Sequence, residues 1–261
     1  MYKRRKVTAV ILAGGSGSRM GTSGNKVYLP LGGRPAISYA VEAFAKHLYV
    51  DELVFVTREA EQAEAEALLH ALSLQKPWRI VLGGESRQAS VYNGIQGMEN
   101  EFVLIHDGAR PLVSQELIGA CVEALMKYDG VVPALPVEGD IYQVPSKGKA
   151  LPERMKGSLY TVQTPQGFRT RIFRTCHEKH RDNPDHTDDS RLLELEGYQV
   201  GIVPGDPQNR KLTTPLDVSV AEAYLHGGVS VDEIVLDETR LRILKRAKYY
   251  LSDGKAVKVQ D

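Results

Sequence analysis

The chain has few of the features that mark disulfide-rich, metal-binding, membrane or nucleic-acid-binding proteins. Its 261 residues include only two cysteines, Cys121 and Cys176, which show no Cys/His ligand spacing. Basic and acidic residues both number 33, so no overall field attracts nucleic acid or an anionic membrane. No apolar run approaches the roughly 20 residues of a membrane span. We therefore expect a cytoplasmic protein with buried, reduced thiols and only local anion-binding sites.

Short apolar runs alternate with helical patterns along most of the chain, which predicts an α/β fold with a mostly parallel sheet covered by helices. The expected strands are residues 8–12, 53–57, 79–82, 102–106, 131–135 and 200–203. The expected helices are residues 35–46, 59–72, 87–98, 116–127 and 214–225. The last begins with Thr214-Pro215-Leu216-Asp217, which predicts an N-cap, a first-turn proline and a capping carboxylate.

Two segments depart from this alternation. Residues 136–160 carry Gly, Pro and charged residues that interrupt every apolar run, which predicts an excursion from the sheet, such as a β-arm. Residues 229–261 are charged, with a helix-like centre at 238–250. We therefore divide the chain into a domain of residues 1–228, with its arm at about 136–160, and a C-terminal appendage of residues 229–261.

The first strand is followed by a glycine-rich segment, residues 12–21, whose bare backbone amides can approach an anion closely. The segment is neither a dinucleotide fingerprint, because Met20 stands where glycine or alanine is required, nor a P-loop, because Gly24-Asn25-Lys26 lacks the Gly-Lys-Ser/Thr ending. Arg19 and Lys26 flank it, and cations there could neutralise a triphosphate. The segment therefore predicts a phosphate cradle.

Other polar groups follow strands or precede helices. Asp107 and Arg110 follow a strand, where ligands of open α/β sheets collect, so Asp107 could orient Mg²⁺ or a hydroxyl and Arg110 could grip a phosphate. The alternative is a plain turn. His106 is better explained as a packed residue than as a base. Lys211 precedes a capped helix, and residues 187–189 could simply begin another helix.

Several separated segments together resemble a known family. The segments are LAGGSGSRMG (12–21), NKVYLPL (25–31), GGESRQASVYNG (83–94), HDGARP (106–111), QTPQGF (163–168), TDDS (187–190) and NRKLTT (209–214). In this order they resemble the 2-C-methyl-D-erythritol 4-phosphate cytidylyltransferases of the non-mevalonate isoprenoid pathway, whose close relatives are the ribitol-5-phosphate cytidylyltransferases. The resemblance extends from about residue 7 to residue 226. It is specific because the motifs occur together.

The resemblance implies a Rossmann-like fold, with a mostly parallel twisted sheet and a protruding β-arm that is exchanged in a homodimer. It also implies Mg²⁺-dependent transfer of CMP from CTP to a polyol phosphate. The implied catalytic residues are Arg19, Lys26 and Lys211. The implied nucleotide-binding residues are Ala13, Gly14, Gly15, Gly83, Gly84, Ser90 and Asp107, the last also a candidate metal ligand. Residues implied to lie near the second substrate are Arg110, Thr164, Thr187 and Asp188.

The arm departs from the family pattern. Family members commonly have Pro-Val-x-Asp-Thr, whereas this chain has Pro-Val-Glu-Gly-Asp at residues 136–140, so Asp140 stands where a substrate-contacting threonine is expected. An acidic group near a phosphate is unfavourable without an intervening cation. Arg154 lies two residues too early for the substrate-positioning arginine, and spacing selects Lys156. Both stay candidates, and they are not equivalent phosphate ligands.

Three alternatives stay open. Ribitol 5-phosphate or another polyol phosphate could replace methylerythritol phosphate as the acceptor. The protein could instead be a nucleotide-binding module without turnover, although the presence of Arg19, Lys26 and Lys211 argues against this. A nicotinamide dehydrogenase is a distant third. In every case we expect small-molecule partners and neither nucleic acid nor a membrane.

Overall fold

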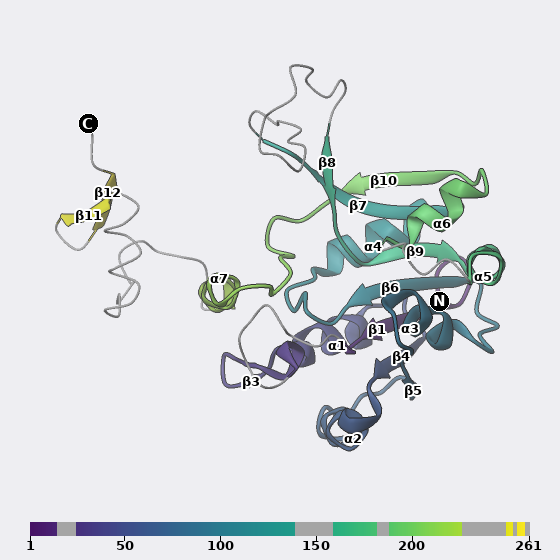
Figure 1. Cartoon of the computed structure of the whole chain (residues 1–261), viewed down its shortest axis with the longest axis horizontal. Coiled ribbons are helices and arrows are strands. Elements are labelled where there is room, and N and C mark those ends of the chain that lie inside the picture. Colours follow the sequence, from purple (N-terminus) through teal and green to yellow (C-terminus); the bar gives the residue numbers. More distant parts are fainter. Residues whose placement is uncertain (15–24, 139–158, 182–187, 226–248, 253–254, 259–261) are drawn as a thin grey trace.

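The computed structural model describes residues 1–14, 25–138, 159–181, 188–225, 249–252 and 255–258. Its centre is an eight-stranded sheet of order β10-β7-β9-β6-β1-β4-β5, with β8 paired to β7 (Figure 1). The strands are β1 (Val7–Leu12), β4 (Glu52–Thr57), β5 (Trp78–Leu82), β6 (Phe102–Asp107), β7 (Gly130–Pro136), β8 (Tyr160–Val162), β9 (Gln166–Arg169) and β10 (Val200–Pro204). All six predicted strands are therefore confirmed.

The sheet is mostly parallel. β1 pairs in parallel with β4 and β6, β4 with β5, and β7 with β10. The exceptions are β8 and β9, neither of which was predicted, and β9 lies antiparallel between β6 and β7. Because β9 runs in the opposite direction, its first residue, Gln166, pairs with Ile105 near the carboxyl end of β6. The residues that precede β9 are thereby brought to that end.

The five predicted helices are present, with shifted ends. The helices are α1 (Ala36–Lys46), α2 (Gln62–Ala71), α3 (Arg87–Ile95), α4 (Gln115–Ala124), α5 (Thr170–Lys179), α6 (Ser190–Leu195) and α7 (Pro215–Leu225). Pro35 lies in a short strand, β3 (Arg34–Pro35), instead of in α1. α3 ends at Ile95, three residues before Met98, because Gln96 is already extended with φ −63° and ψ 138°. At α7, Asp217 Oδ2 accepts the backbone N–H of Thr214 at 2.8 Å, as the predicted cap requires.

Helices cover both faces of the sheet. Phe102 and Leu104 of β6 pack in an apolar cluster with residues of α1, α2 and α4. Val103 and Ile105 pack in a second cluster with residues of α3, α5 and α6. By the same alternation, His106 lies on the face covered by α1, with its ring centroid 5.0 Å from that of Phe44. Asp107 lies on the opposite face, where it pairs with Arg87 of α3. The end of β6 thus separates a packed histidine from a charged aspartate.

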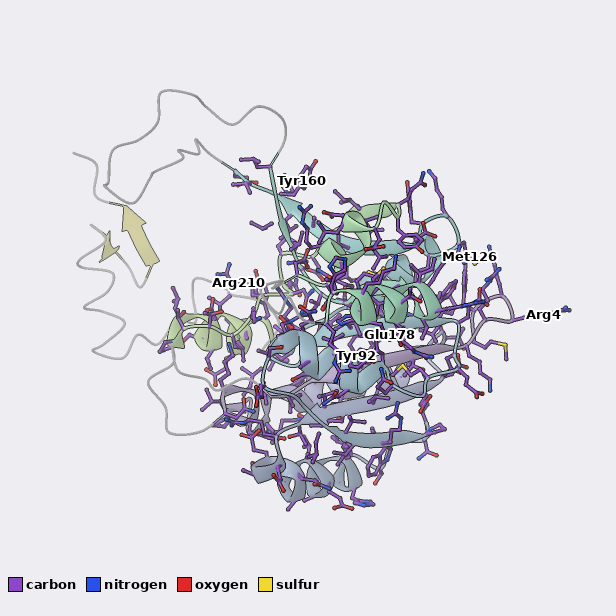
Figure 2. The ribbon with its side chains drawn as sticks, turned by 45° about the vertical axis from the view of Figure 1, so that its right-hand side comes forward. Arg4, Tyr92, Met126, Tyr160, Glu178 and Arg210 are labelled. Atoms are coloured by element: carbon purple, nitrogen blue, oxygen red, sulfur yellow. The ribbon has the colours of Figure 1, made fainter. Side chains whose placement is uncertain are left out.

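The segment predicted as an arm begins and ends in a two-stranded ladder. β7 and β8 pair antiparallel from Ala134–Val162 to Pro136–Tyr160. Figure 1 shows the pair extending away from the sheet, and Figure 2 labels Tyr160 at its outer end. Residues 139–158, which connect the two strands and include Asp140, Arg154 and Lys156, lie outside the described residues. The described residues on either side of this segment therefore lie next to each other, and the arm itself stays a prediction.

The appendage differs from expectation. β11 (Tyr249–Ser252) and β12 (Lys255–Lys258) pair only with each other. The predicted helix over 238–250 is therefore wrong at its last two residues, and the rest of it lies outside the described residues. Tyrosine favours strands, and the Asp-Gly pair between β11 and β12 in the sequence is a hairpin turn signal that helical spacing obscured.

Two findings bear on the expected environment. Cys121 and Cys176 are both buried and free, as predicted. Among the described helices, none has the length and apolarity that crossing a bilayer requires.

A buried histidine makes stability depend on pH. His177 on α5 is 1% exposed, and neither ring nitrogen has a hydrogen-bond partner among the described residues. Burial, aided by the charge of Arg87, lowers its pKa to about 3. Because the unfolded chain binds the proton more readily, stability should fall as pH drops below about 6.5, by at most about 1.4 kcal/mol per pH unit for this group.

We predict that His177→Phe reduces this loss, because phenylalanine fills similar space beside Phe173 and does not titrate. When the pH is lowered from 7 to 5, the free energy of unfolding of the wild type should fall by about 2 kcal/mol more than that of the variant. Urea unfolding at the two pH values measures this difference. His70→Gln, a change at an exposed histidine on α2, is the matched control for the loss of a histidine. Identical slopes for His177→Phe and wild type would contradict the prediction.

Candidate active site

The predicted site residues gather around the carboxyl ends of the parallel strands. Ala13 and Gly14 follow β1, Gly83 and Gly84 follow β5, and Asp107 ends β6. Described site residues are Ala13, Gly14, Lys26, Gly83, Gly84, Ser90, Asp107, Arg110, Thr164, Asp188 and Lys211. The others, Gly15, Arg19, Asp140, Arg154, Lys156 and Thr187, lie outside the described residues. Carboxyl strand ends are where open α/β sheets bind ligands.

Asn25 connects the end of β1 with the short helix that carries Lys26. Its side-chain amide donates to the carbonyl of Ala13 and, at 2.8 Å, to Glu61 Oε2. Its Oδ1 accepts from Val27 N at 3.3 Å and so caps a short 3-10 helix, η2 (Lys26–Tyr28). Asn25 is only 6% exposed. The backbone of Lys26 is therefore fixed beside the end of β1.

Gly83 and Gly84 follow β5 and are held in place by hydrogen bonds to Thr57 and Ser90. Gly83 N donates to the carbonyl of Thr57 at 2.8 Å, and Gly84 N donates to Ser90 Oγ at 3.1 Å. A Cβ atom at Gly84 would lie 2.5 Å from that of Ala89, so only glycine fits without a shift. The Ser90 hydroxyl accepts the Gly84 N–H. Because neither glycine has a side chain, their backbone is bare beside the edge of the sheet.

Asp107 is the most strongly paired acidic group of the site. Lys211 Nζ lies 2.6 Å from Oδ2, and Arg87 Nη2 lies 3.3 Å from Oδ1. Burial alone would raise the pKa of Asp107, but the positive charges of Arg87 and Lys211 outweigh it and hold the pKa well below its usual range. Asp107 is therefore a permanent carboxylate that orients cations.

Thr164 and His106 form a hydrogen-bond relay beside Asp107. Asp107 N donates to Thr164 Oγ1 at 3.0 Å, and Oγ1 lies 3.1 Å from His106 Nδ1. His106 Nε2 lies 3.0 Å from the carbonyl of Arg110, which can only accept. Nε2 therefore carries the proton, and the threonine hydroxyl donates to Nδ1. Complete burial lowers the pKa of His106 to about 4, so it is a neutral structural group, as the sequence indicated.

Arg110 and Lys211 are positioned by paired loops. Arg110 Nη1 donates to the carbonyl of Asn209 at 2.8 Å, and Asn209 Nδ2 donates to the carbonyl of Thr164 at 2.7 Å. Gln163 adds two bonds to Asp206, at 2.9 and 3.0 Å. These contacts join residues 163–164 to residues 206–209. The segment that carries Lys211 is thereby held against the end of β6.

Asp188 belongs to the neighbouring edge. Its Oδ1 accepts from Gln166 Nε2 at 2.5 Å, and its Oδ2 accepts from Ser190 Oγ at 2.7 Å. These bonds attach the start of α6 to the first residue of β9. Asp188 is therefore hydrogen-bonded to Gln166, which follows Thr164 by two residues. Both carboxylate oxygens of Asp188 already accept hydrogen bonds.

Sequence reasoning did not single out Arg87, Asn25, Gln163 and Asn209. Arg87 carried a usable signal, since a basic residue at the first position of a helix opposes the helix dipole and requires another reason to be there. The two amides on residues 163 and 209 carried none, because their bonds depend on loops that only the folded sheet brings together.

Asp107 does not fit as a direct magnesium ligand in this arrangement. Both of its oxygens contact cations, and a metal ion would have to displace Lys211 or Arg87. Among the described residues, no group of three or more His, Cys, Asp or Glu side chains could hold a metal ion. Mg²⁺ commonly uses few protein ligands and binds substrate phosphates and water instead.

The fold and the site define a class of protein. Glycines follow β1 and β5, and Lys211 and Arg110 lie beside Asp107 at the end of β6. This combination suits an anionic nucleotide whose phosphates meet backbone amides and fixed cations. It is the arrangement expected of a nucleotidyltransferase.

Comparisons with known proteins give the family. The family model described as "2-C-methyl-D-erythritol 4-phosphate cytidylyltransferase" matches residues 7–227. A protein of that name from Synechocystis is 39% identical over 219 residues, which are 83% of this chain and 95% of the relative. One from Caldanaerobacter subterraneus is 40% identical over 224 residues, covering 84% of this chain and 98% of the relative. The chain belongs to the 2-C-methyl-D-erythritol 4-phosphate cytidylyltransferase family and is a nucleotidyltransferase.

Solved structures agree with this assignment. The 4-diphosphocytidyl-2C-methyl-D-erythritol synthase of Anaerococcus prevotii superposes with a TM-score of 0.75 at 28% identity, covering 85% of this chain and 99% of that one. The 2-C-methyl-D-erythritol 4-phosphate cytidylyltransferase of Thermus thermophilus gives a TM-score of 0.67 at 28% identity, covering 83% and 98%. The predicted family and fold are thus confirmed.

We predict that Thr164→Val destabilises the protein by about 1–3 kcal/mol, because it leaves the Asp107 N–H and His106 Nδ1 buried without a partner. Thr164→Ser keeps the hydroxyl and should recover most of the loss. Urea unfolding at neutral pH measures both. Equal stability of the valine and serine variants would show that the relay contributes nothing.

Proposed function

We propose that the protein transfers CMP from CTP to 2-C-methyl-D-erythritol 4-phosphate and releases pyrophosphate, a step in isoprenoid precursor biosynthesis. The observation that carries this proposal is the Lys211 ammonium held 2.6 Å from Asp107 at the end of β6, beside Arg110. A fixed cation there suits the phosphate of an acceptor. Membership of the family supplies the identity of the nucleotide and of the acceptor.

In the proposed reaction, a phosphate oxygen of the acceptor attacks the α-phosphorus of CTP. The bond from that phosphorus to the bridging oxygen breaks, and pyrophosphate leaves with the electron pair. Both reactants are anions, so the barrier is mainly one of position and charge. The nucleophile is already ionised and needs no base, which agrees with His106 being neutral and bonded at both nitrogens.

We assign the charged residues as follows. Lys26, with Arg19, takes up charge that develops on the α-phosphate and the leaving pyrophosphate. Lys211 and Arg110 hold the acceptor phosphate, and Asp107 keeps Lys211 in place. Ala13, Gly14 and Gly15 would hold the triphosphate, and Gly83 and Gly84 would lie beside the base. Thr164, Thr187 and Asp188 border the acceptor.

The arm completes the proposal. We propose that it reaches a second copy of the chain in a homodimer, and that Arg154 or Lys156 positions the acceptor there. Asp140, where the family commonly has threonine, makes the acceptor half of the site the place where specificity would differ. We also propose that the enzyme uses Mg²⁺, which would neutralise phosphate charge when bound with the triphosphate.

We predict that Lys26→Ala lowers turnover by about two to three orders of magnitude, the effect of removing one pre-placed charge-stabilising donor. The variant should unfold at a urea concentration close to that of the wild type. Lys46→Ala, which removes an exposed lysine at the end of α1, is the matched control and should keep full activity. Near-normal turnover of folded Lys26→Ala would remove Lys26 from the catalytic residues.

The acceptor is identified by a substrate panel. Pyrophosphate release should be fastest with CTP and methylerythritol phosphate, compared with ribitol 5-phosphate and other polyol phosphates in the presence of Mg²⁺. A faster reaction with ribitol 5-phosphate would reassign the acceptor while leaving the reaction class intact. CTP binding without turnover of any acceptor would instead favour a nucleotide-binding module.

A further inference from the structure

Arg87 lies between two carboxylates at the candidate active site. Its Nη2 is 2.8 Å from Asp189 Oδ2 and 3.3 Å from Asp107 Oδ1. Asp107 holds Lys211 through its other oxygen, Oδ2, at 2.6 Å. One line of ion pairs therefore joins the start of α6, the start of α3, the end of β6 and the segment before α7.

The helix starts at which Arg87 and Asp189 lie do not explain the contacts of their side chains. Arg87 is the first residue of α3, where the helix dipole disfavours a cation. Asp189 directly precedes α6, where an aspartate commonly caps the helix, yet its side chain makes no capping bond. Both side chains turn toward each other instead. We therefore look for the role of the Arg87–Asp189 ion pair in the contact that Arg87 makes with Asp107.

Burial makes the pair rigid. Asp189 is 3% exposed, and its burial raises its pKa even though the charge of Arg87 acts in the other direction. A carboxylate in such a place requires its cation, because an unpaired buried charge is strongly destabilising. The guanidinium is thus fixed from one side by Asp189. The same Nη2 also contacts Asp107 Oδ1 at 3.3 Å, and Asp107 Oδ2 faces Lys211.

We infer that Arg87 is a positioning residue for nucleotidyl transfer: held by Asp189, it fixes the orientation of the Asp107 carboxylate, which presents Lys211 to the acceptor phosphate. The inference rests on the proposed function of Lys211. Arg87 lies three residues before Ser90, whose hydroxyl accepts the Gly84 N–H. The first turn of α3 therefore couples the nucleotide half of the site to the acceptor half.

Variants of the pair separate positioning from stability. Arg87→Met leaves Asp189 buried without its cation, and Asp189→Leu leaves Arg87 with Asp107 in place of two carboxylates, so both variants should unfold at lower urea concentrations than wild type. The double variant removes both charges, and exchange of a buried ion pair for apolar groups is often neutral, so it should unfold close to wild type. Arg87→Lys keeps the charge but lacks the guanidinium edge, whose Nε and Nη2 both face Asp107 Oδ1, at 3.4 and 3.3 Å.

The kinetic constants of the folded double variant show whether Arg87 positions the acceptor site. We expect kcat/KM for the acceptor to fall about ten- to a hundredfold, the cost of a misplaced catalytic group, while the Kd for CTP changes little. Arg87→Lys should show the same selective loss. Arg169→Met is the matched control, because Arg169 pairs with Asp129 and Glu101 away from the Asp107 cluster. Arg169→Met should lower the stability and leave both kcat/KM for the acceptor and the Kd for CTP unchanged.

A double variant with wild-type kcat/KM for the acceptor would overturn the inference. The wild type, measured in the same assay, tests the proposed function separately. A crystal structure of the double variant provides the readout that does not depend on turnover. We expect the contact between Asp107 Oδ2 and Lys211 Nζ to be lost, and its retention at about the wild-type distance would also overturn the inference.

Discussion

The ion pair between Asp107 and Lys211 joins positions 104 residues apart in the sequence, and most of the candidate site is arranged around it. Asp107 ends a central strand of the sheet, while Lys211 lies in the segment that follows β10. Between the two strands, β9 enters antiparallel, so that Thr164 meets the Asp107 backbone. Three separate segments of the chain therefore converge on one carboxylate.

Such a cluster is costly to assemble, because charged groups lose water when they are buried. The chain offsets that cost by giving each charged group opposite charges or hydrogen bonds. Asp107 has two cations, and Arg110 has a backbone carbonyl as its partner. The neighbouring His106 avoids the cost by being neutral. A preorganised arrangement of this kind need not reorganise when a phosphate arrives, which is the property that electrostatic catalysis requires.

The sequence was sufficient for the features that depend on local patterns. Six strands were predictable because each is a short apolar run bounded by turn residues, and α7 was predictable from its cap. β9 was not, because Gln166, Gly167 and Arg169 leave it one large apolar residue, although its first three residues are buried. Its position between two parallel strands is a property of the whole sheet, which no local pattern encodes.

The site divides in the same way. The glycines after β1 and β5 and Asp107 could be placed at one edge from the sequence, because each directly follows a strand. The partners of Asp107 could not, since Lys211 and Arg87 reach it from segments whose routes are set by β10 and α3. The motifs that carry the family resemblance contain both cations, but they do not say that one carboxylate lies between them. Only the folded structure gives that connection.

We propose that the carboxyl edge of the sheet binds the nucleotide, with its phosphates directed toward the fixed cations. A crystal structure of the protein with CTP and Mg²⁺ would show whether this is so. We expect the cytosine to lie against Gly83 and Gly84 and the triphosphate against Ala13 and Gly14. Density for CTP on any other part of the molecule, with this edge unoccupied, would contradict it.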